Sequence, residues 1–218
     1  MTGGRISQAL VANQVILDGR LALFHQRESW LAVADLHFGY ELSQRAAGNL
    51  FPLWGMQTIE ARLNELVRDY RPSRLILLGD LVHDAAAADE LAALVRQLNR
   101  LCGVVLIAGN HDRNIRKTRA KWDAELVDSW RSDGFRFYHG HCPNGNGRGI
   151  KVIGHYHPAG VIRDRAGLRL KLPAFVQHGD CWIMPAFSPW AAGTEWRNQE
   201  SRTWLCSPHR VFRFGGDD

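Results

Sequence analysis

The stretch Leu75-Ile76-Leu77-Leu78-Gly79-Asp80 places an uninterrupted apolar run directly before a glycine and an acidic residue. Continuous apolar runs of this length are typical of strands that a sheet buries on both faces. The segment from Val104 to Ala108, followed by Gly109 and Asn110, repeats the arrangement. The two runs predict an open α/β sheet with a ligand site at the carboxyl ends of its strands.

The segments around these two strands alternate between helical and strand patterns. Apolar residues recur with a helical period in residues 56–70 and 89–101. Short apolar runs at residues 15–17, 21–24 and 30–34 predict an opening strand meander. Short strands with glycine turns are expected after residue 135. We therefore predict a single α/β domain over residues 1–218, a two-layered β core flanked by helices.

The composition is that of a globular protein. A chain of 218 residues with 45% hydrophobic content can bury a sizeable core. No stretch approaches the roughly 18 consecutive apolar residues of a membrane-spanning helix, and no secretory signal is visible. The four cysteines are scattered without a C-x-x-C pair, which is typical of reduced thiols. These features predict a cytoplasmic protein without a membrane partner.

Polar residues gather in short motifs that follow the predicted strands. The motifs are Asp35-Leu36-His37, Gly79-Asp80, Gly109-Asn110-His111-Asp112 and Gly154-His155-Tyr156-His157. The alternation of side chains in extended backbone predicts that Asp35 and His37 point the same way, and likewise His155 and His157. The glycines are expected to permit a sharp exit from each strand.

The residue types in these motifs predict a pair of divalent metal ions. Carboxylate, amide and imidazole ligands without a thiolate favour manganese, iron, zinc or cobalt. Two ions that share Asp80 would lie about 3.5–4 Å apart and would activate a bridging hydroxide for attack on a phosphoester.

The motifs and their order resemble those of the calcineurin-like metallophosphoesterases. The resemblance implies a four-layer sandwich in which helices flank two mixed β-sheets. It implies that the first ion is held by Asp35, His37, Asp80 and His157, and the second by Asp80, Asn110, His139 and His155. His139, rather than the neighbouring His141, matches the family ligand.

In that family the histidine matching His111 contacts the phosphoryl group and assists the leaving oxygen. Asp112 or Asp84 could orient it, and either could equally be a surface acid. The run Gly79-Asp80-Leu81-Val82-His83 is similar to an element of the SbcD-type DNA nucleases. That similarity implies a catalytic, substrate-contacting role for His83, with an ordinary helix-start histidine as the alternative.

Three further segments resemble small bacterial metallophosphoesterases associated with DNA ligase and helicase repair clusters. They are Ala34-Asp35-Leu36-His37-Phe38-Gly39, Arg71-Pro72-Ser73-Arg74 and Met184-Pro185-Ala186-Phe187. The resemblance implies a manganese-dependent endonuclease that cleaves single-stranded DNA in repair, in functional association with a ligase and a helicase. A phosphatase or phosphodiesterase for a small molecule such as a nucleotide is the main alternative, and a non-catalytic scaffold is a third.

Positive charge and tryptophan provide candidate nucleic-acid contacts. The net charge is +5, and two groups of cations stand out: Arg113, Arg116, Lys117, Arg119 and Lys121, then Arg163, Arg165, Arg169 and Lys171. A solvated face would explain either group, but the position of the first beside the metal motifs favours a polyanionic substrate. Trp122 and Trp130 could stack on bases or lie in the core, and Trp54 and Trp190 could flank the crevice.

Overall fold

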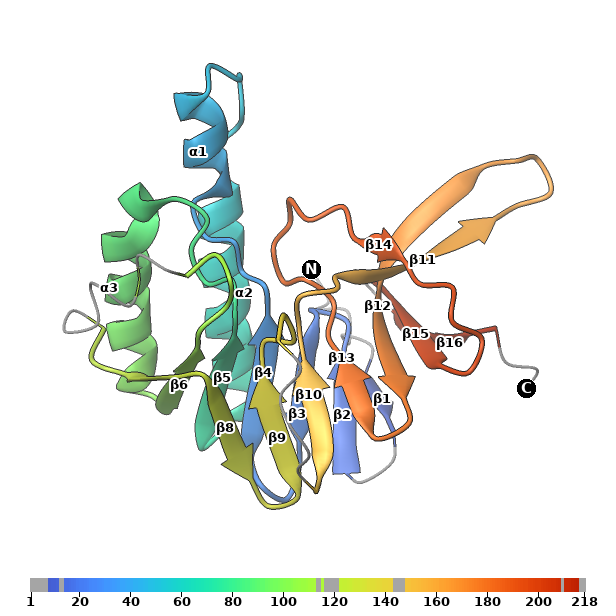
Figure 1. Ribbon diagram of the computed structural model, residues 1–218. Helices are drawn as coiled ribbons and strands as arrows, with labels where there is room; N and C mark the ends of the chain where they lie inside the picture. The colour runs from blue at the N-terminus through green and yellow to red at the C-terminus, as the bar shows by residue number, and fades with distance from the viewer. Residues whose placement is uncertain are drawn as a thin grey trace.

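The computed structural model of the protein describes residues 8–11, 14–112, 115, 122–142, 148–208 and 210–215. Its helices and strands form two mixed sheets that pack against each other, with helices beside the first sheet (Figure 1). The predicted α/β sandwich is therefore confirmed. In the described part of the chain, no helix has the length and apolar character needed to cross a bilayer.

The first sheet follows chain order from edge to edge. Its described strands are β1 (Gln8–Leu10), β2 (Val15–Asp18), β3 (Ala22–His25), β4 (Trp30–Ala34), β5 (Arg74–Leu78), β6 (Gly103–Ile107) and β7 (Glu125–Val127). Strands β1 to β4 are antiparallel neighbours, as the predicted meander requires. Strands β4 to β7 are parallel, so their carboxyl ends lie at one edge of the sheet.

The second sheet contains the strands expected after residue 135 and one that precedes it. Its described strands are β8 (Ser129–Ser132), β9 (Phe135–Tyr138), β10 (Ile150–Ile153), β11 (Pro158–Arg163), β12 (Arg169–His178), β13 (Cys181–Ile183), β14 (Thr194–Glu195), β15 (Arg202–Ser207) and β16 (Arg210–Phe214). Strand β10 runs parallel to both β9 and β13. The outer parts of β11 and β12 form a hairpin that projects from the body of the protein (Figure 1).

The described residues contain α1 (Tyr40–Ala46), α2 (Gly55–Tyr70) and α3 (Ala88–Asn99), with a 3₁₀ turn η2 at Ala85–Ala87. Helices α2 and α3 match the predicted periodicity. In α2 the buried side chains include Ile59, Leu63 and Leu66, which recur at helical spacing. Helix α1 was not predicted, because its seven residues carry too short a pattern.

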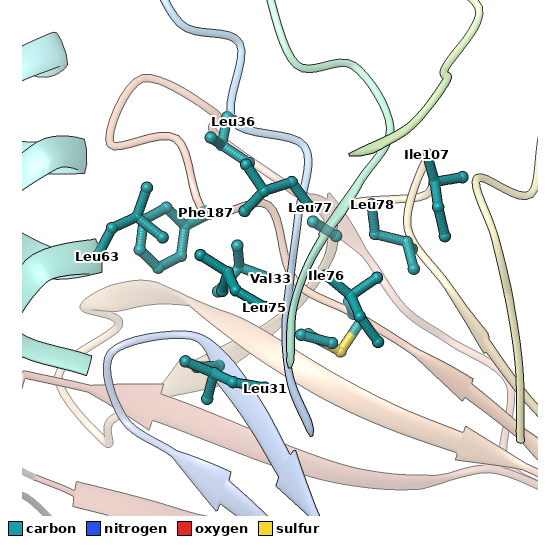
Figure 2. Close-up of a cluster of buried hydrophobic side chains, with 14 of the residues drawn as sticks. Leu31, Val33, Leu36, Leu63, Leu75, Ile76, Leu77, Leu78, Ile107 and Phe187 are labelled. Atoms are coloured by element: carbon teal, nitrogen blue, oxygen red, sulfur yellow. The ribbon is translucent and has the colours of Figure 1, made fainter. Parts of the chain in front are cut away.

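The central strand β5 is buried on both faces, as its apolar run predicts. Figure 2 shows Leu63 of α2 and Phe187 on the side of Leu75, while Ile76 lies on the other face. These four side chains are almost completely buried, and each large apolar side chain contributes about 1.5–3 kcal/mol when it leaves water. The helices therefore cover one face of the first sheet and leave the other to the second sheet.

Aromatic side chains join the two sheets. Trp30 of β4 packs edge-on against Phe135 and Phe137 of β9, with ring centroids 5.0 and 4.9 Å apart. Edge-to-face aromatic pairs add roughly 0.5–1.5 kcal/mol beyond their buried area. This packing brings the carboxyl ends of β9 and β10 beside those of β4 and β5, where the polar motifs lie.

Candidate metal centre

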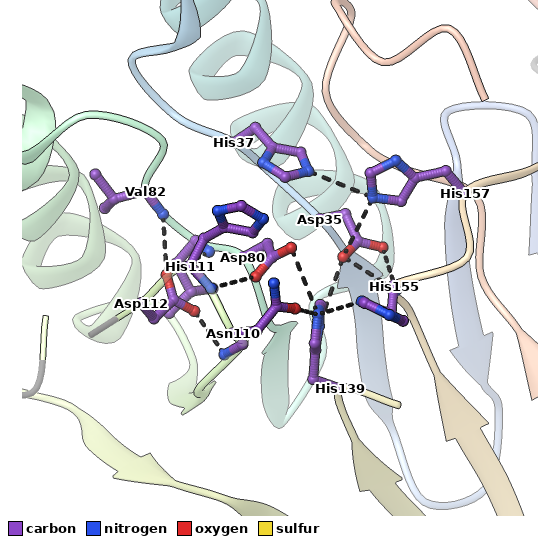
Figure 3. Close-up of polar contacts among 12 residues, drawn as sticks. Asp35, His37, Asp80, Val82, Asn110, His111, Asp112, His139, His155 and His157 are labelled. Carbon is purple, nitrogen blue, oxygen red and sulfur yellow. Dashed lines mark hydrogen bonds and ion pairs between the residues drawn. The ribbon is translucent and has the colours of Figure 1, made fainter. Parts of the chain in front are cut away.

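The first group of potential metal ligands consists of Asp35, His37 and His157. Their ligand atoms all lie within 4.8 Å of one another. The Nε2 atoms of His37 and His157 are 3.3 Å apart, and His157 Nε2 is 3.6 Å from Asp35 Oδ1 (Figure 3). Asp35 and His37 follow β4, whereas His157 follows β10, so the group draws on both sheets.

The second group consists of Asp80, His139 and His155, whose ligand atoms also lie within 4.8 Å of one another. His139 Nε2 is 3.2 Å from His155 Nδ1 and 3.5 Å from Asp80 Oδ2. It is also 3.0 Å from Oδ1 of Asn110. In Figure 3 dashed lines join Asp80 to His111 and to His139, and its backbone oxygen accepts a hydrogen bond from the backbone N–H of His37 at 2.8 Å.

The spacing of these atoms fits divalent metal ions. Nitrogens bound to one tetrahedral or octahedral ion at about 2.0–2.1 Å would lie about 2.9–3.4 Å apart. The imidazole pairs in the two groups lie at 3.3 and 3.2 Å. The donor set of carboxylate, amide and imidazole groups lacks thiolate and suits Mn²⁺, Fe²⁺, Co²⁺ or Zn²⁺. The predicted ligands therefore converge as two adjacent divalent-cation sites.

The pKa values of three ligands, His37, His155 and Asp80, shift in the direction that favours metal binding. Burial lowers the pKa of His37 to about 4, and burial followed by the charge of His139 lowers the pKa of His155. Both imidazoles are therefore neutral near pH 7 and keep a free lone pair. Burial opposes ionisation of Asp80, but hydrogen bonding and charge interaction with His139 hold the pKa of this carboxyl well below its usual value.

The backbone at the ligands differs from the predicted extended conformation. Asp35, His37, Asp80, His155 and His157 have φ angles of 55°, 44°, 43°, 70° and 45°, all in the left-handed region. Strand alternation was therefore the wrong reason for the convergence of Asp35 and His37. His155 and His157 likewise leave the extended conformation, and they belong to different groups, as the family resemblance implied. Turns after each strand, rather than the pleat, aim these side chains.

Glycine is needed in these turns chiefly because other groups approach closely. A Cβ atom on Gly79 would collide with the ring of His139, and one on Gly109 would collide with Oδ1 of Asp80. Gly79 also has a φ of 73°, which supports the predicted sharp exit from β5. Gly109 has no positive φ, so close packing against Asp80 is the reason for this glycine.

Asp112 connects two of the turns and does not hydrogen-bond to the ring of His111. Its Oδ2 accepts a hydrogen bond from Gly109 N at 2.7 Å, and its Oδ1 accepts one from Leu81 N at 2.9 Å. Burial raises the pKa of this carboxyl to about 6. Asp84, the other candidate for orienting His111, accepts a local hydrogen bond from the backbone N–H of Ala86. In the described part of the chain, both carboxylates therefore accept hydrogen bonds from backbone N–H groups and not from the ring of His111.

His83 and His111, the two predicted catalytic histidines, lie beside the first group. The ring centroid of His37 is 5.8 Å from that of His83 and 6.0 Å from that of His111. The backbone N–H of His111 donates to Asp80 Oδ1 at 3.1 Å, which leaves its exposed ring free to face a substrate. Burial, followed by the charge of His111, lowers the pKa of His83.

The structure describes the predicted tryptophan contacts to DNA but not the predicted basic ones. The basic residues Arg113, Arg116, Lys117, Arg119 and Lys121 lie outside the described residues. Trp122 is completely buried, which confirms the core alternative over stacking on bases. Trp130 is half-buried and packs on Phe137, with centroids 5.6 Å apart.

Trp190 lies where the sequence suggested, at the crevice. It lines a pocket of about 160 Å³ together with His37 and His157 of the first group. Tyr40 also lines this pocket and was not singled out from the sequence. Glu41, which accepts a hydrogen bond from the Trp190 indole, was missed because the two residues are 149 positions apart in the chain.

Comparison with known proteins agrees with this geometry. The family model of the calcineurin-like phosphoesterases matches residues 30–206. The chain belongs to this family. Two ligand groups at the carboxyl ends of parallel strands, with His111 beside them, are therefore the candidate centre of a phosphoester hydrolase.

Solved structures provide a second comparison for this phosphoesterase. The crystal structure of the Pseudomonas putida nuclease MPE has a TM-score of 0.75 and 27% sequence identity, and the match covers 96% of this chain and 100% of that one. A protein of unknown function from Aquifex aeolicus, AQ665, has a TM-score of 0.41 and 16% identity over 63% of this chain and 81% of that one. No curated protein matches the phosphoesterase.

Proposed function

We propose that this phosphoesterase is a manganese-dependent endonuclease that cleaves single-stranded DNA. The likeness to the Pseudomonas putida nuclease over 96% of the chain is the observation that carries the proposal. The two adjacent ligand groups support it, because paired divalent ions are suited to phosphodiester hydrolysis. We place the enzyme in cytoplasmic DNA repair, in functional association with a DNA ligase and a helicase.

The side chains of the site fit two metal ions, each bound mainly by one of the two groups. Asp35, His37 and His157 would hold one ion, Asn110, His139 and His155 the other, and Asp80 both. When bound, the ions supply Lewis acidity toward the phosphoryl oxygens and an activated water. Mn²⁺ suits this set of carboxylate, amide and imidazole donors.

The two histidines outside the ligand groups would act on the substrate. The exposed ring of His111 is held next to Asp80 through its own backbone N–H. Imidazole side chains commonly act as general acids, so His111 can donate a proton to the departing ester oxygen. His83 lies 6.4 Å from His111 in a stacked arrangement and can donate a hydrogen bond to the same phosphate. Asp112 keeps the turns that carry both histidines together.

The projecting hairpin of β11 and β12 supports a polyanionic substrate. Arg163 and Arg169 are directly opposite each other in the antiparallel register, and both are exposed. Like charges at opposed positions destabilise a strand pair, and Glu195, which is ion-paired with Arg197, offsets part of the charge of both arginines. A bound phosphate backbone would offset this repulsion. Because β11 begins directly after His157, the hairpin extends from the metal centre itself.

Removing charge from the hairpin should affect DNA more than a small substrate. The variant Arg163→Gln/Arg169→Gln is expected to bind single-stranded DNA more weakly, and its log–log salt slope should fall by about 0.7 for each lost phosphate contact. The ratio of DNA cleavage to hydrolysis of bis(p-nitrophenyl) phosphate should fall as well. Arg27→Gln/Arg68→Gln removes two exposed arginines from a turn and from α2 and serves as the matched control. Equal salt slopes for both double variants would rule out a phosphate contact at the hairpin.

Circular single-stranded DNA provides the direct test of the proposed activity. With Mn²⁺ the enzyme is expected to linearise the circle, because an endonuclease needs no free end. Parallel reactions with Mg²⁺, Co²⁺ and Zn²⁺ establish the metal preference, and gel electrophoresis measures the product. An intact circle together with rapid turnover of mononucleotides would instead establish a small-molecule phosphatase, for which the pocket of about 160 Å³ beside the first group is the candidate site.

A further inference from the structure

An aromatic wall borders the pocket beside the first ligand group. The pocket is lined by three histidines, His37, His83 and His157, by the rings of Tyr40 and Trp190, and by Ser188 and Ala191. None of its lining residues is an acidic residue, a lysine or an arginine. The pocket is thus suited to an uncharged, flat group that is attached to something held by the metal centre.

The wall is larger than its two lining rings. Trp190 packs against Trp54 with ring centroids 4.2 Å apart and against Phe51 at 4.7 Å, and its ring is stacked toward Tyr40 at 6.5 Å with an interplanar angle of 29°. The ring of Tyr40 is in turn 4.8 Å from that of His83, the proposed substrate contact. Ring contacts therefore connect His83, beside the metal centre, through Tyr40 and Trp190 to Trp54 and Phe51.

A buried carboxylate fixes the orientation of Trp190. Glu41 is 1% exposed, its Oε2 accepts a hydrogen bond from Trp190 Nε1 at 3.0 Å, and its Oε1 accepts one from Met56 N at 2.7 Å. Burying a carboxylate is costly unless hydrogen bonds compensate. Gly55 completes the arrangement, because a Cβ there would lie 2.9 Å from both Glu41 oxygens and would collide with the indole. Glu41 and the turn at Gly55 and Met56 thus hold a tryptophan ring that lies far from them in the sequence.

The surface beside this wall is also unusually apolar. Leu50 is fully exposed, and Leu53 and Trp54 are each 44% exposed. Adjacent exposed apolar side chains are typical of a binding surface. Single-stranded nucleic acid presents base faces that bind such surfaces, because its bases are free to unstack from one another.

We infer that Trp190 and Tyr40 form a nucleobase subsite, on which the base next to the scissile phosphate stacks. The inference rests on the proposed nuclease function and specifies how that site recognises its substrate. A phosphate at the first ligand group lies beside the pocket, so its own nucleoside is within reach of the wall. Glu41 is a positioning residue that holds the indole. Stacking accepts any base, so the subsite selects unpaired strands rather than a sequence.

The test uses two single-stranded oligonucleotides with identical flanks. One carries a central tract of thymidines and the other a tract of abasic tetrahydrofuran residues. Loss of one stacked base typically weakens binding about 5- to 150-fold, so the wild-type enzyme with Mn²⁺ should cut the abasic tract at least about 5-fold more slowly. Trp190→Ala should cut both tracts at nearly the same, slow rate, and Trp190→Phe should restore the preference.

A tryptophan elsewhere provides the control for general destabilisation. Trp130→Ala removes a half-buried tryptophan from β8 and should keep the preference for the thymidine tract. Equal cutting of the two tracts by the wild-type enzyme, or an unchanged preference in Trp190→Ala, would overturn the subsite. In either case the cutting itself would still support the nuclease. If the wild-type enzyme cut neither tract, the proposed function would fall and the subsite with it.

Discussion

Replacing Asp80 with alanine is expected to remove both metal ions and to abolish phosphoesterase activity. Asp80 belongs to the second ligand group and is proposed to bind both ions, and its interaction with His139 holds its pKa well below the usual value. A carboxylate shared by two coordination spheres has no substitute when it is lost. The loss of activity should exceed the roughly 100-fold that follows removal of an outer hydrogen-bond partner of a metal ligand. Metal analysis by mass spectrometry and hydrolysis of bis(p-nitrophenyl) phosphate measure the two effects.

Two further variants distinguish the effect of the charge of Asp80 from the effect of its hydrogen bond and from that of a nearby carboxylate. Asp80→Asn keeps an oxygen that can accept the hydrogen bond from His111 N but removes the negative charge, so it should lose metal as the alanine variant does. Asp84→Asn changes a nearby carboxylate whose described hydrogen bond is local, and it should retain both ions. An Asp80→Ala protein that keeps two ions and full activity would refute the assignment of this residue.

Replacing His111 with alanine is expected to leave both ions bound while slowing DNA cleavage about 10²- to 10⁴-fold, the usual contribution of a general acid. The backbone N–H that donates to Asp80 remains in alanine, so the turn should keep its shape. The loss should be much smaller for bis(p-nitrophenyl) phosphate, because nitrophenolate leaves without needing a proton. Comparing kcat for the two substrates tests the role directly.

His141 provides the matched control for this variant. It is an exposed histidine whose ring centroid lies 5.2 Å from that of His139, yet it belongs to neither ligand group. His141→Ala should therefore cleave DNA far faster than His111→Ala. A His111→Ala enzyme that slows equally on both substrates would show that the imidazole does not protonate the leaving oxygen.

Much of this fold could be predicted because the local sequence patterns agree with where those segments lie in the folded protein. The apolar runs of β5 and β6 specify buried parallel strands, and parallel strands bring their carboxyl ends together. Polar residues that follow such strands are therefore brought close together at that edge of the sheet. The order of the motifs identified the family, which the match over residues 30–206 confirms.

The sequence could not predict how the side chains converge. A left-handed φ at Asp35 or His157 could not be predicted locally, because aspartate and histidine adopt it more often than most residues but still only in a minority of positions. The bond between Glu41 and Trp190 joins residues that only the folded chain brings together. Trp122 has a basic run before it, yet its side chain is completely buried, because apolar packing decided its position and neighbouring charge did not.

The left-handed residues of the metal centre have a consequence for how this protein can evolve. Such conformations cost on the order of 1–3 kcal/mol each in residues other than glycine. Five of them occur together here, in a fold whose net stability is expected to be about 5–15 kcal/mol. A laboratory selection for heat resistance alone would therefore favour glycine at half-buried His37, His155 and His157. The resulting protein would be more stable but would lose metal ligands and with them its activity.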